Sequence, residues 1–216
     1  MKVHLKKLRD QVIVITGASS GIGLATAKLA AKAGAKLVLV SRDAAELRTI
    51  TEDIRANGGD AIYVAADVAD LPAIERVAEM AVQRFGRFDT WINNAAVAIY
   101  GKLTEVPMAE KRQLFEIDFW GVVHGCKVAV EHLRERGGAI INIGSTLSER
   151  SIPLQGIYSA AKHAVKAYTD TLRMELEQEG APISVTLIKP GAIDTPYPHH
   201  ARSHLGVLPT NPPPVY

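Results

Sequence analysis

Short, wholly apolar runs alternate with longer segments of mixed polarity along most of the chain. The runs are rich in β-branched residues, as at Val12–Ile15 and Leu37–Val40, and such uninterrupted runs are typical of strands buried on both faces. The alternation predicts βαβ units, and therefore an α/β fold with a doubly wound parallel sheet and helices on both sides. Strands are expected at residues 12–16, 36–41, 61–66, 90–95, 139–145 and 183–189, and helices at 23–35, 43–57, 71–86, 108–136 and 155–179.

The pattern ends after Pro190. Residues 192–216 contain six of the chain's eleven prolines, which favours loop or extended chain over packed helix. We therefore expect an N-terminal segment at 1–10, a single doubly wound domain at 11–195, and a proline-rich C-terminal loop at 196–216.

Composition and charge exclude several classes of protein. A chain of 216 residues suits one sizeable core. Its 25 basic and 23 acidic residues give a net charge of +2 and are dispersed, whereas a general nucleic-acid-binding protein needs a clustered basic face. No apolar window has the length needed to span a bilayer, so we expect a cytoplasmic protein without a membrane segment.

Neither the cysteine nor the histidine cluster indicates a metal site. Cys126 is the only cysteine, which rules out an intramolecular disulfide, and its apolar neighbours indicate core packing. The histidines of "HHARSH", His199–His204, lack neighbouring acidic ligands and a helical frame, so a solvated loop is expected there.

The stretch "TGASSGIG", Thr16–Gly23, lies between the first predicted strand and the first predicted helix. Glycines at 17, 21 and 23 permit a tight turn and a close approach of the backbone to a ligand, and the N–H groups of a helix N-terminus attract an anion. The spacing predicts a phosphate-binding turn, with a tight turn that binds no ligand as a serious alternative when the motif is taken alone.

Three further motifs follow in order: "NNAA" at Asn93–Ala96, "YSAAK" at Tyr158–Lys162 and "PGAIDT" at Pro190–Thr195. With the glycine-rich turn, they resemble the motifs of the short-chain dehydrogenase/reductase family, single-domain Rossmann-fold enzymes that use nicotinamide cofactors. The match extends from Asp10 to Thr195. Members of that family usually continue with a substrate-covering segment, a further helix and a last strand. Residues 196–216 are therefore either a proline-rich loop of a naturally short protein or a truncated substrate-covering region of a longer one.

The resemblance also implies which residues hold the cofactor. They come from the glycine-rich turn, the ends of the second and third strands, the asparagine pair, the "YSAAK" helix and the segment after the last strand: Gly17, Ser19, Ser20, Gly21, Ile22, Gly23, Ser41, Arg42, Asp67, Val68, Asn94, Tyr158, Lys162, Pro190, Gly191, Ile193 and Thr195.

Tyr158 and Lys162 lie four residues apart, and therefore on one face of the predicted helix, and Ser145 ends a buried strand. By resemblance, Tyr158 exchanges a proton with the substrate oxygen, Lys162 favours the tyrosine phenolate and holds the nicotinamide ribose, and Ser145 orients the substrate. Taken one at a time, such residues are more often a helix surface or a turn cap.

The position of the family's fourth catalytic residue, an asparagine, is occupied by Asp118. The family asparagine acts through its main-chain carbonyl, so Asp118 is kept as a catalytic candidate whose side chain changes the local charge.

The residues after the second strand predict the choice of cofactor. Ser41 stands where an acidic residue would bind the adenosine ribose, and the guanidinium of Arg42 suits a 2′-phosphate. We expect NADP(H), with NAD(H) as the alternative. Asp43 is interpreted as a helix cap, although it is also placed to be the ribose ligand instead.

The sequence therefore predicts an NADP-dependent oxidoreductase that interconverts a carbonyl and an alcohol on a small, partly apolar molecule. The alternative is a nucleotide-binding sensor or scaffold without efficient catalysis, and an epimerase or dehydratase is a third option. The family resemblance implies a homo-oligomer in which Phe115, Phe119 and Trp120 meet a partner subunit, and a core-facing stripe explains these aromatics equally well.

Overall fold

The computed structural model describes residues 3–196, 201–207 and 215. Six strands form one parallel sheet in the order β3-β2-β1-β4-β6-β7, with the order reversing across β1 and β4. The strands are β1 (Val12–Thr16), β2 (Lys36–Ser41), β3 (Asp60–Ala65), β4 (Thr90–Asn93), β6 (Gly138–Ile143) and β7 (Ile183–Ile188). The doubly wound α/β sheet predicted from the apolar runs is confirmed.

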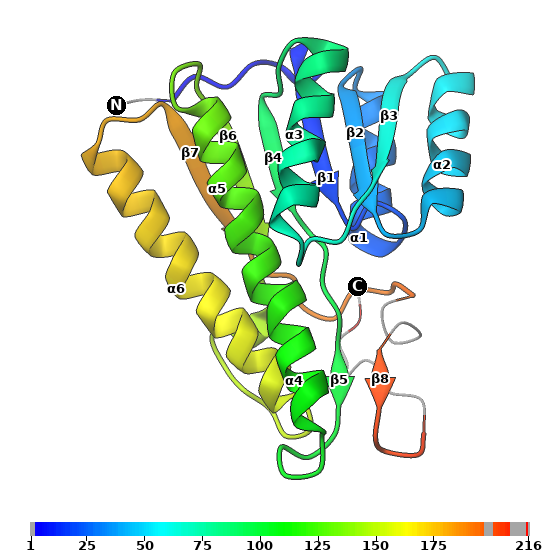
Figure 1. Ribbon diagram of the computed structural model, residues 1–216, viewed down its shortest axis with the longest axis vertical. Coiled ribbons are helices and arrows are strands. Elements are labelled where there is room, and N and C mark those ends of the chain that lie inside the picture. The colour runs from blue at the N-terminus through cyan, green and yellow to red at the C-terminus, as the bar shows by residue number, and fades with distance from the viewer. Residues whose placement is uncertain (1–2, 197–200, 208–214, 216) are drawn as a thin grey trace.

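The helices connect successive strands. They are α1 (Gly21–Lys32), α2 (Ala44–Ala56), α3 (Leu71–Phe85), α4 (Met108–Phe115), α5 (Gly121–Leu133) and α6 (Gly156–Gln178). Figure 1 shows α3, α5 and α6 side by side on one face of the sheet. The side chains of α1 and α2 pack in a second cluster on the other face.

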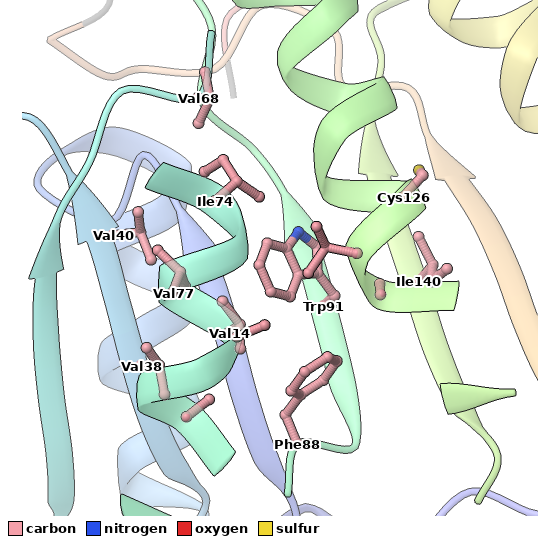
Figure 2. Close-up of a cluster of buried hydrophobic side chains, with 14 of the residues drawn as sticks. Val14, Val38, Val40, Val68, Ile74, Val77, Phe88, Trp91, Cys126 and Ile140 are labelled. Atoms are coloured by element: carbon pink, nitrogen blue, oxygen red, sulfur yellow. The ribbon is translucent and has the colours of Figure 1, made fainter. Parts of the chain in front are cut away.

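The period of two along each strand explains why the central strands are apolar throughout. Val14 and Val38 contribute to the cluster under α3 and α5, whereas their neighbours Ile13 and Leu37 contribute to the cluster under α1 and α2. Figure 2 shows Val14, Val38 and Trp91 with Ile140 and the α3 side chains of the first cluster. Both faces are therefore buried, which keeps the carboxyl ends of these strands in fixed positions.

A polar network crosses the core between β4, β6 and the two helices above them. The Trp91 indole N–H donates to Asn93 Oδ1 at 2.8 Å, and Asn93 Nδ2 donates to Asn142 Oδ1 at 2.8 Å. Asn142 Nδ2 then donates to the Thr169 hydroxyl of α6 at 2.9 Å. Gly125 permits this packing, because a Cβ there would lie 2.0 Å from Asn93 Oδ1.

The predicted helix at 108–136 is continuous to Leu133 but not regular, because a π-helical turn, Glu116–Trp120, lies between α4 and α5. Within this turn Ile117 and Asp118 are buried, while Trp120 is 44% exposed. The turn also places Asp118 inside the protein.

Two very short strands were not predicted. β5 (Ile99–Tyr100) pairs in parallel with β8 (Arg202–Ser203), which belongs to the proline-rich segment. Figure 1 shows this pair below the main sheet, on the side of its carboxyl ends. In the described residues 201–207, β8 is followed by bends, and β8 lies against the loop that follows β4.

Candidate active site

The carboxyl ends of the strands open into a cavity of about 430 Å³, a size typical of small-molecule sites. The sequence-predicted residues that line it are Gly17, Ser19, Ser20, Gly21, Ile22, Ser41, Arg42, Asp67, Val68, Asn94, Ser145, Tyr158, Lys162, Pro190, Gly191, Ile193 and Thr195. Two residues of the predicted set, Gly23 and Asp118, do not line the cavity, and Asp118 is fully buried.

The glycine-rich turn requires glycine at positions 17, 21 and 23 for two different reasons. Gly17 and Gly21 have φ values of +66° and +53°, in the left-handed region that favours glycine. A Cβ on Gly23 would lie 2.2 Å from the Gly17 carbonyl oxygen. α1 starts at Gly21, and Ser20 makes no side-chain capping bond, so the first-turn N–H groups suit an anion.

Asn94 connects this turn to the end of β4. Its side-chain amide donates to the carbonyl oxygens of Thr16 at 2.9 Å and Gly17 at 3.1 Å. Its backbone N–H donates to the Thr16 hydroxyl at 3.0 Å. Asn94 therefore fixes the shape of the turn, in addition to lining the cavity.

The loop after β2 has the arrangement that the sequence suggested. Asp43 Oδ1 accepts a hydrogen bond from the Glu46 N–H at 3.0 Å and caps α2. Ser41 supports the same cap, because its hydroxyl accepts from the Asp43 N–H at 3.2 Å. Arg42 is exposed and lines the cavity, so its guanidinium is available to an anionic ligand. Asp43 also lines the cavity.

Ser145 follows β6 in an extended conformation and is 9% exposed. Its hydroxyl oxygen accepts a hydrogen bond from the Leu147 N–H at 3.1 Å, capping the short 3-10 turn Thr146–Ser148. A serine hydroxyl has two acceptor positions and one proton. The capping bond therefore fixes the oxygen while its proton stays available to a substrate.

Tyr158 and Lys162 lie on the buried face of α6. The Lys162 ammonium lies 5.5 Å from the centre of the Tyr158 ring and donates to the Ile143 carbonyl oxygen at 3.2 Å. Lys162 is 2% exposed and Tyr158 is 9% exposed. The Lys162 ammonium therefore lies over the Tyr158 ring, in a region with little access to water.

Asp118 is fully buried behind Lys162. Its Oδ1 accepts a hydrogen bond from the Val97 N–H at 2.8 Å, and its Oδ2 lies 3.8 Å from the Lys162 ammonium. Among the described residues, Oδ2 has no hydrogen-bond partner. Burial raises the pKa of Asp118 to about 6, against the opposing effects of Lys162 and of the Val97 N–H.

Sequence reasoning missed several cavity residues, and four of them have side chains that bear on substrate binding: Tyr100, Leu147, Ile152 and Gln155. Leu147 and Ile152 lie between Ser145 and Tyr158 in the sequence, and Gln155 lies three residues before Tyr158. Their closeness in the sequence to Ser145 and Tyr158 could have identified these three as cavity residues. Tyr100 carried no such signal, because its place depends on the pairing of β5 with β8.

The other sequence features take simple structural roles. Trp91 and Cys126 are fully buried, and His163 Nδ1 bonds the Ser159 carbonyl within its own helix at 2.8 Å. No group of three metal-ligating side chains occurs in the described ranges, and His199 and His200 lie outside them. No helix in the part of the chain that the structure describes is long and apolar enough to cross a membrane.

Comparisons with known proteins agree with this geometry. A family model described as short chain dehydrogenase matches residues 11–206. An uncharacterized oxidoreductase of Bacillus subtilis, YxnA, is 50% identical over 97% of the chain, and the chain spans 60% of the length of that relative.

Two solved structures share the fold. A short-chain dehydrogenase/reductase from Burkholderia phymatum in complex with NAD has a TM-score of 0.88 and 32% identity, covering 91% of this chain and 70% of that one. An alcohol dehydrogenase from Thermococcus sibiricus complexed with 5-hydroxy-NADP has a TM-score of 0.83 and 30% identity, covering 89% and 80% respectively.

Proposed function

The chain belongs to the short-chain dehydrogenase family, and from this premise we propose that it transfers a hydride between NADP(H) and a carbonyl or secondary alcohol of a small molecule. The observation that carries the proposal is the buried Lys162 ammonium against the ring of Tyr158, in a cavity that also contains Ser145.

The cavity fits a nicotinamide dinucleotide. The bare backbone at Gly17 and Gly21 and the uncapped start of α1 suit its pyrophosphate. Arg42, at the opposite end of the cavity from Ser145, suits a 2′-phosphate, which supports NADP(H) over NAD(H). The two solved relatives are bound to NAD and to a hydroxy-NADP, so they favour neither cofactor.

Tyr158 is proposed as the acid and base of the reaction. A reduced nicotinamide bound in the cavity would supply the hydride for the carbonyl carbon. Tyr158 would give its proton to the carbonyl oxygen, whose π electron pair forms the new O–H bond. Ser145 donates a hydrogen bond to the same oxygen, and Lys162 stabilises the phenolate that remains.

Two exposed apolar side chains support the further proposal of a homo-oligomer. Trp120, at the end of the π-helical turn, is 44% exposed, and Met174, in α6, is 52% exposed. Phe119 packs instead against Tyr168, with ring centres 6.2 Å apart. A cytoplasmic location stays a prediction.

The test is the variant Tyr158→Phe, with Tyr168→Phe on the same helix as the matched control. NADPH and NADH binding are first measured by nicotinamide fluorescence, and turnover is then followed with a panel of ketones, aldehydes and secondary alcohols. We expect Tyr158→Phe to bind cofactor but to lose at least about 100-fold in kcat. Retained turnover would contradict the proposed proton donor, and cofactor binding without turnover by the wild type would favour a sensor.

A further inference from the structure

Two polar side chains at the substrate end of the cavity have no part in the proposed proton transfer. Tyr100 in β5 and Gln155, just before α6, both line the cavity with Tyr158. The Gln155 side chain and Tyr158 both lie close enough to the Tyr100 hydroxyl to influence its pKa. The pair therefore lies next to the group that is proposed to exchange a proton with the substrate.

The backbone around Tyr100 is held on both sides. On one side, the His204 N–H donates to the Tyr100 carbonyl at 2.8 Å and the Arg202 N–H donates to the Ala98 carbonyl at 3.0 Å. On the other side, the Gly101 N–H donates to the Leu154 carbonyl at 2.9 Å. Tyr100 is therefore fixed before any substrate arrives, which is the property that a selective contact needs.

Gln155 is positioned by an unusual turn. Leu154 has a φ of +68° and is the one non-glycine residue with a positive φ in the described part of the chain. A leucine adopts this conformation when its surroundings enforce it, and such residues cluster at ligand sites. Here the bond to Gly101 and the start of α6 enforce it, and they bring the Gln155 amide to Tyr100.

The remaining walls near this pair are apolar. Leu147 and Ile152 line the cavity between Ser145 and Tyr158. The charged lining residues among those described are Lys162, which is buried against Tyr158, and three residues that follow β2 and β3, two strands that lie on the other side of β1 from β6: Arg42, Asp43 and Asp67.

We propose that Tyr100 and Gln155 form a second hydrogen-bonding site for the substrate, so that the enzyme takes an uncharged, partly apolar molecule with a second oxygen function close to the reacting carbon. The substrate class is therefore the vicinal diketones, hydroxyketones and diols. The reacting oxygen binds Ser145 and Tyr158, and the second oxygen binds Tyr100 and Gln155. This inference rests on the proposed function and adds a substrate class to it.

Burial raises the pKa of Tyr100, and the neighbouring Tyr158 raises it further. Tyr100 is therefore neutral at physiological pH and keeps a proton to donate. The Gln155 amide both donates and accepts, so the pair can bind either a carbonyl or a hydroxyl oxygen.

The test uses cyclohexanone and 1,2-cyclohexanedione, which differ in the second carbonyl, with 2-oxobutyrate as an anionic probe. The readout is the preference, the ratio of kcat/KM for the diketone to kcat/KM for the monoketone. This ratio cancels the intrinsic reactivity of the two ketones when a variant is compared with the wild type. We expect Tyr100→Phe and Gln155→Met each to lower the preference about tenfold, the effect of one hydrogen bond.

Tyr63→Phe, on β3 and outside the cavity lining, is the control and should leave the preference unchanged. Thermal unfolding identifies any variant that fails to fold, and either variant alone suffices for the test. An unchanged preference in both, or turnover of 2-oxobutyrate equal to that of the diketone, overturns the proposal. Cofactor binding without turnover of any of these probes overturns the substrate class alone, whereas failure to bind NADPH and NADH overturns the proposed function itself.

Discussion

The Asp118 carboxylate lies 3.8 Å from the Lys162 ammonium, and both groups are almost completely removed from water. This distance is short enough for an ion pair and too long for a hydrogen bond. Asp118 therefore balances the charge of Lys162 without restraining its position tightly. Buried pairs of this kind give little net stability, because removing each charge from water is costly.

The raised pKa of Asp118 should be detectable in the pH dependence of the free energy of unfolding. Its pKa rises from an ordinary value of 3.8 to about 6 in the folded protein, so the unfolded chain ionises first as pH increases. The free energy of unfolding should therefore fall by ~3 kcal/mol across that interval, at 1.36 kcal/mol per pH unit, and then level off. Urea unfolding of wild type and Asp118→Asn from pH 3.5 to 7.5 measures the difference between them.

Asparagine cannot ionise, so the stability difference, wild type minus Asp118→Asn, should decrease as pH rises, whatever its starting value. Glu52→Gln, an exposed position on α2, controls for the loss of one carboxylate. A difference that is flat between pH 3.5 and 7.5 would show that Asp118 is ionised normally in the folded protein.

The close packing of the glycine-rich turn makes Gly23→Ala severe. The new methyl group would lie 2.2 Å from a backbone oxygen of Gly17 and 2.5 Å from the Asn94 amide, so the turn itself must open. We expect a loss of ~1–3 kcal/mol in stability and at least about tenfold weaker cofactor binding. Lys28→Ala, on the exposed side of the same helix, should leave both unchanged in thermal unfolding and fluorescence titration.

Arg42 is expected to set the cofactor preference. Loss of a charge-assisted contact to the 2′-phosphate in Arg42→Ala should weaken NADPH binding about 10- to 100-fold and change NADH binding less than about threefold. Arg48→Ala, exposed on α2, controls for the loss of one positive charge. If wild type binds NADH more tightly, or if the variant loses both cofactors equally, the role given to Arg42 is wrong.

Two buried threonines allow a paired test of the core. The Thr169 hydroxyl accepts from Asn142 at 2.9 Å and donates to the Val165 carbonyl, whereas the Thr51 hydroxyl has no partner among the described residues. Thr169→Val should cost ~1–3 kcal/mol, because it leaves a buried amide unsatisfied, and Thr51→Val should be neutral or stabilising. Chemical denaturation measures both, and equal effects would contradict the network.

The positions of most strands could be predicted, because a buried strand is recognisable from its local run of apolar residues. Strands such as β1 and β2 are apolar on both faces, and the residues between them have helical length. The glycine-rich turn and the "YSAAK" helix could likewise be located, because each acts within a few consecutive residues. The cap at Asp43 followed from the same kind of local rule.

Features that depend on long-range contacts were not predictable. The π-helical turn follows no local signal, since its residues also suit an ordinary helix, and it forms where Asp118 meets Val97 from a distant loop. The site formed by Tyr100 and Gln155 requires β5, β8 and the turn at Leu154 to meet. No short window of sequence contains that information.

The π-helical turn also makes the length of this segment more important than its composition. Each residue of an ordinary helix turns the chain by about 100°. Deleting one residue between α4 and α5 would permit a regular helix, but it would rotate Asp118 relative to Gly125, which must face Asn93 in β4. The segment thus sets the helical phase between the cavity and the core, and a single-residue deletion should be tolerated less well than most substitutions within it.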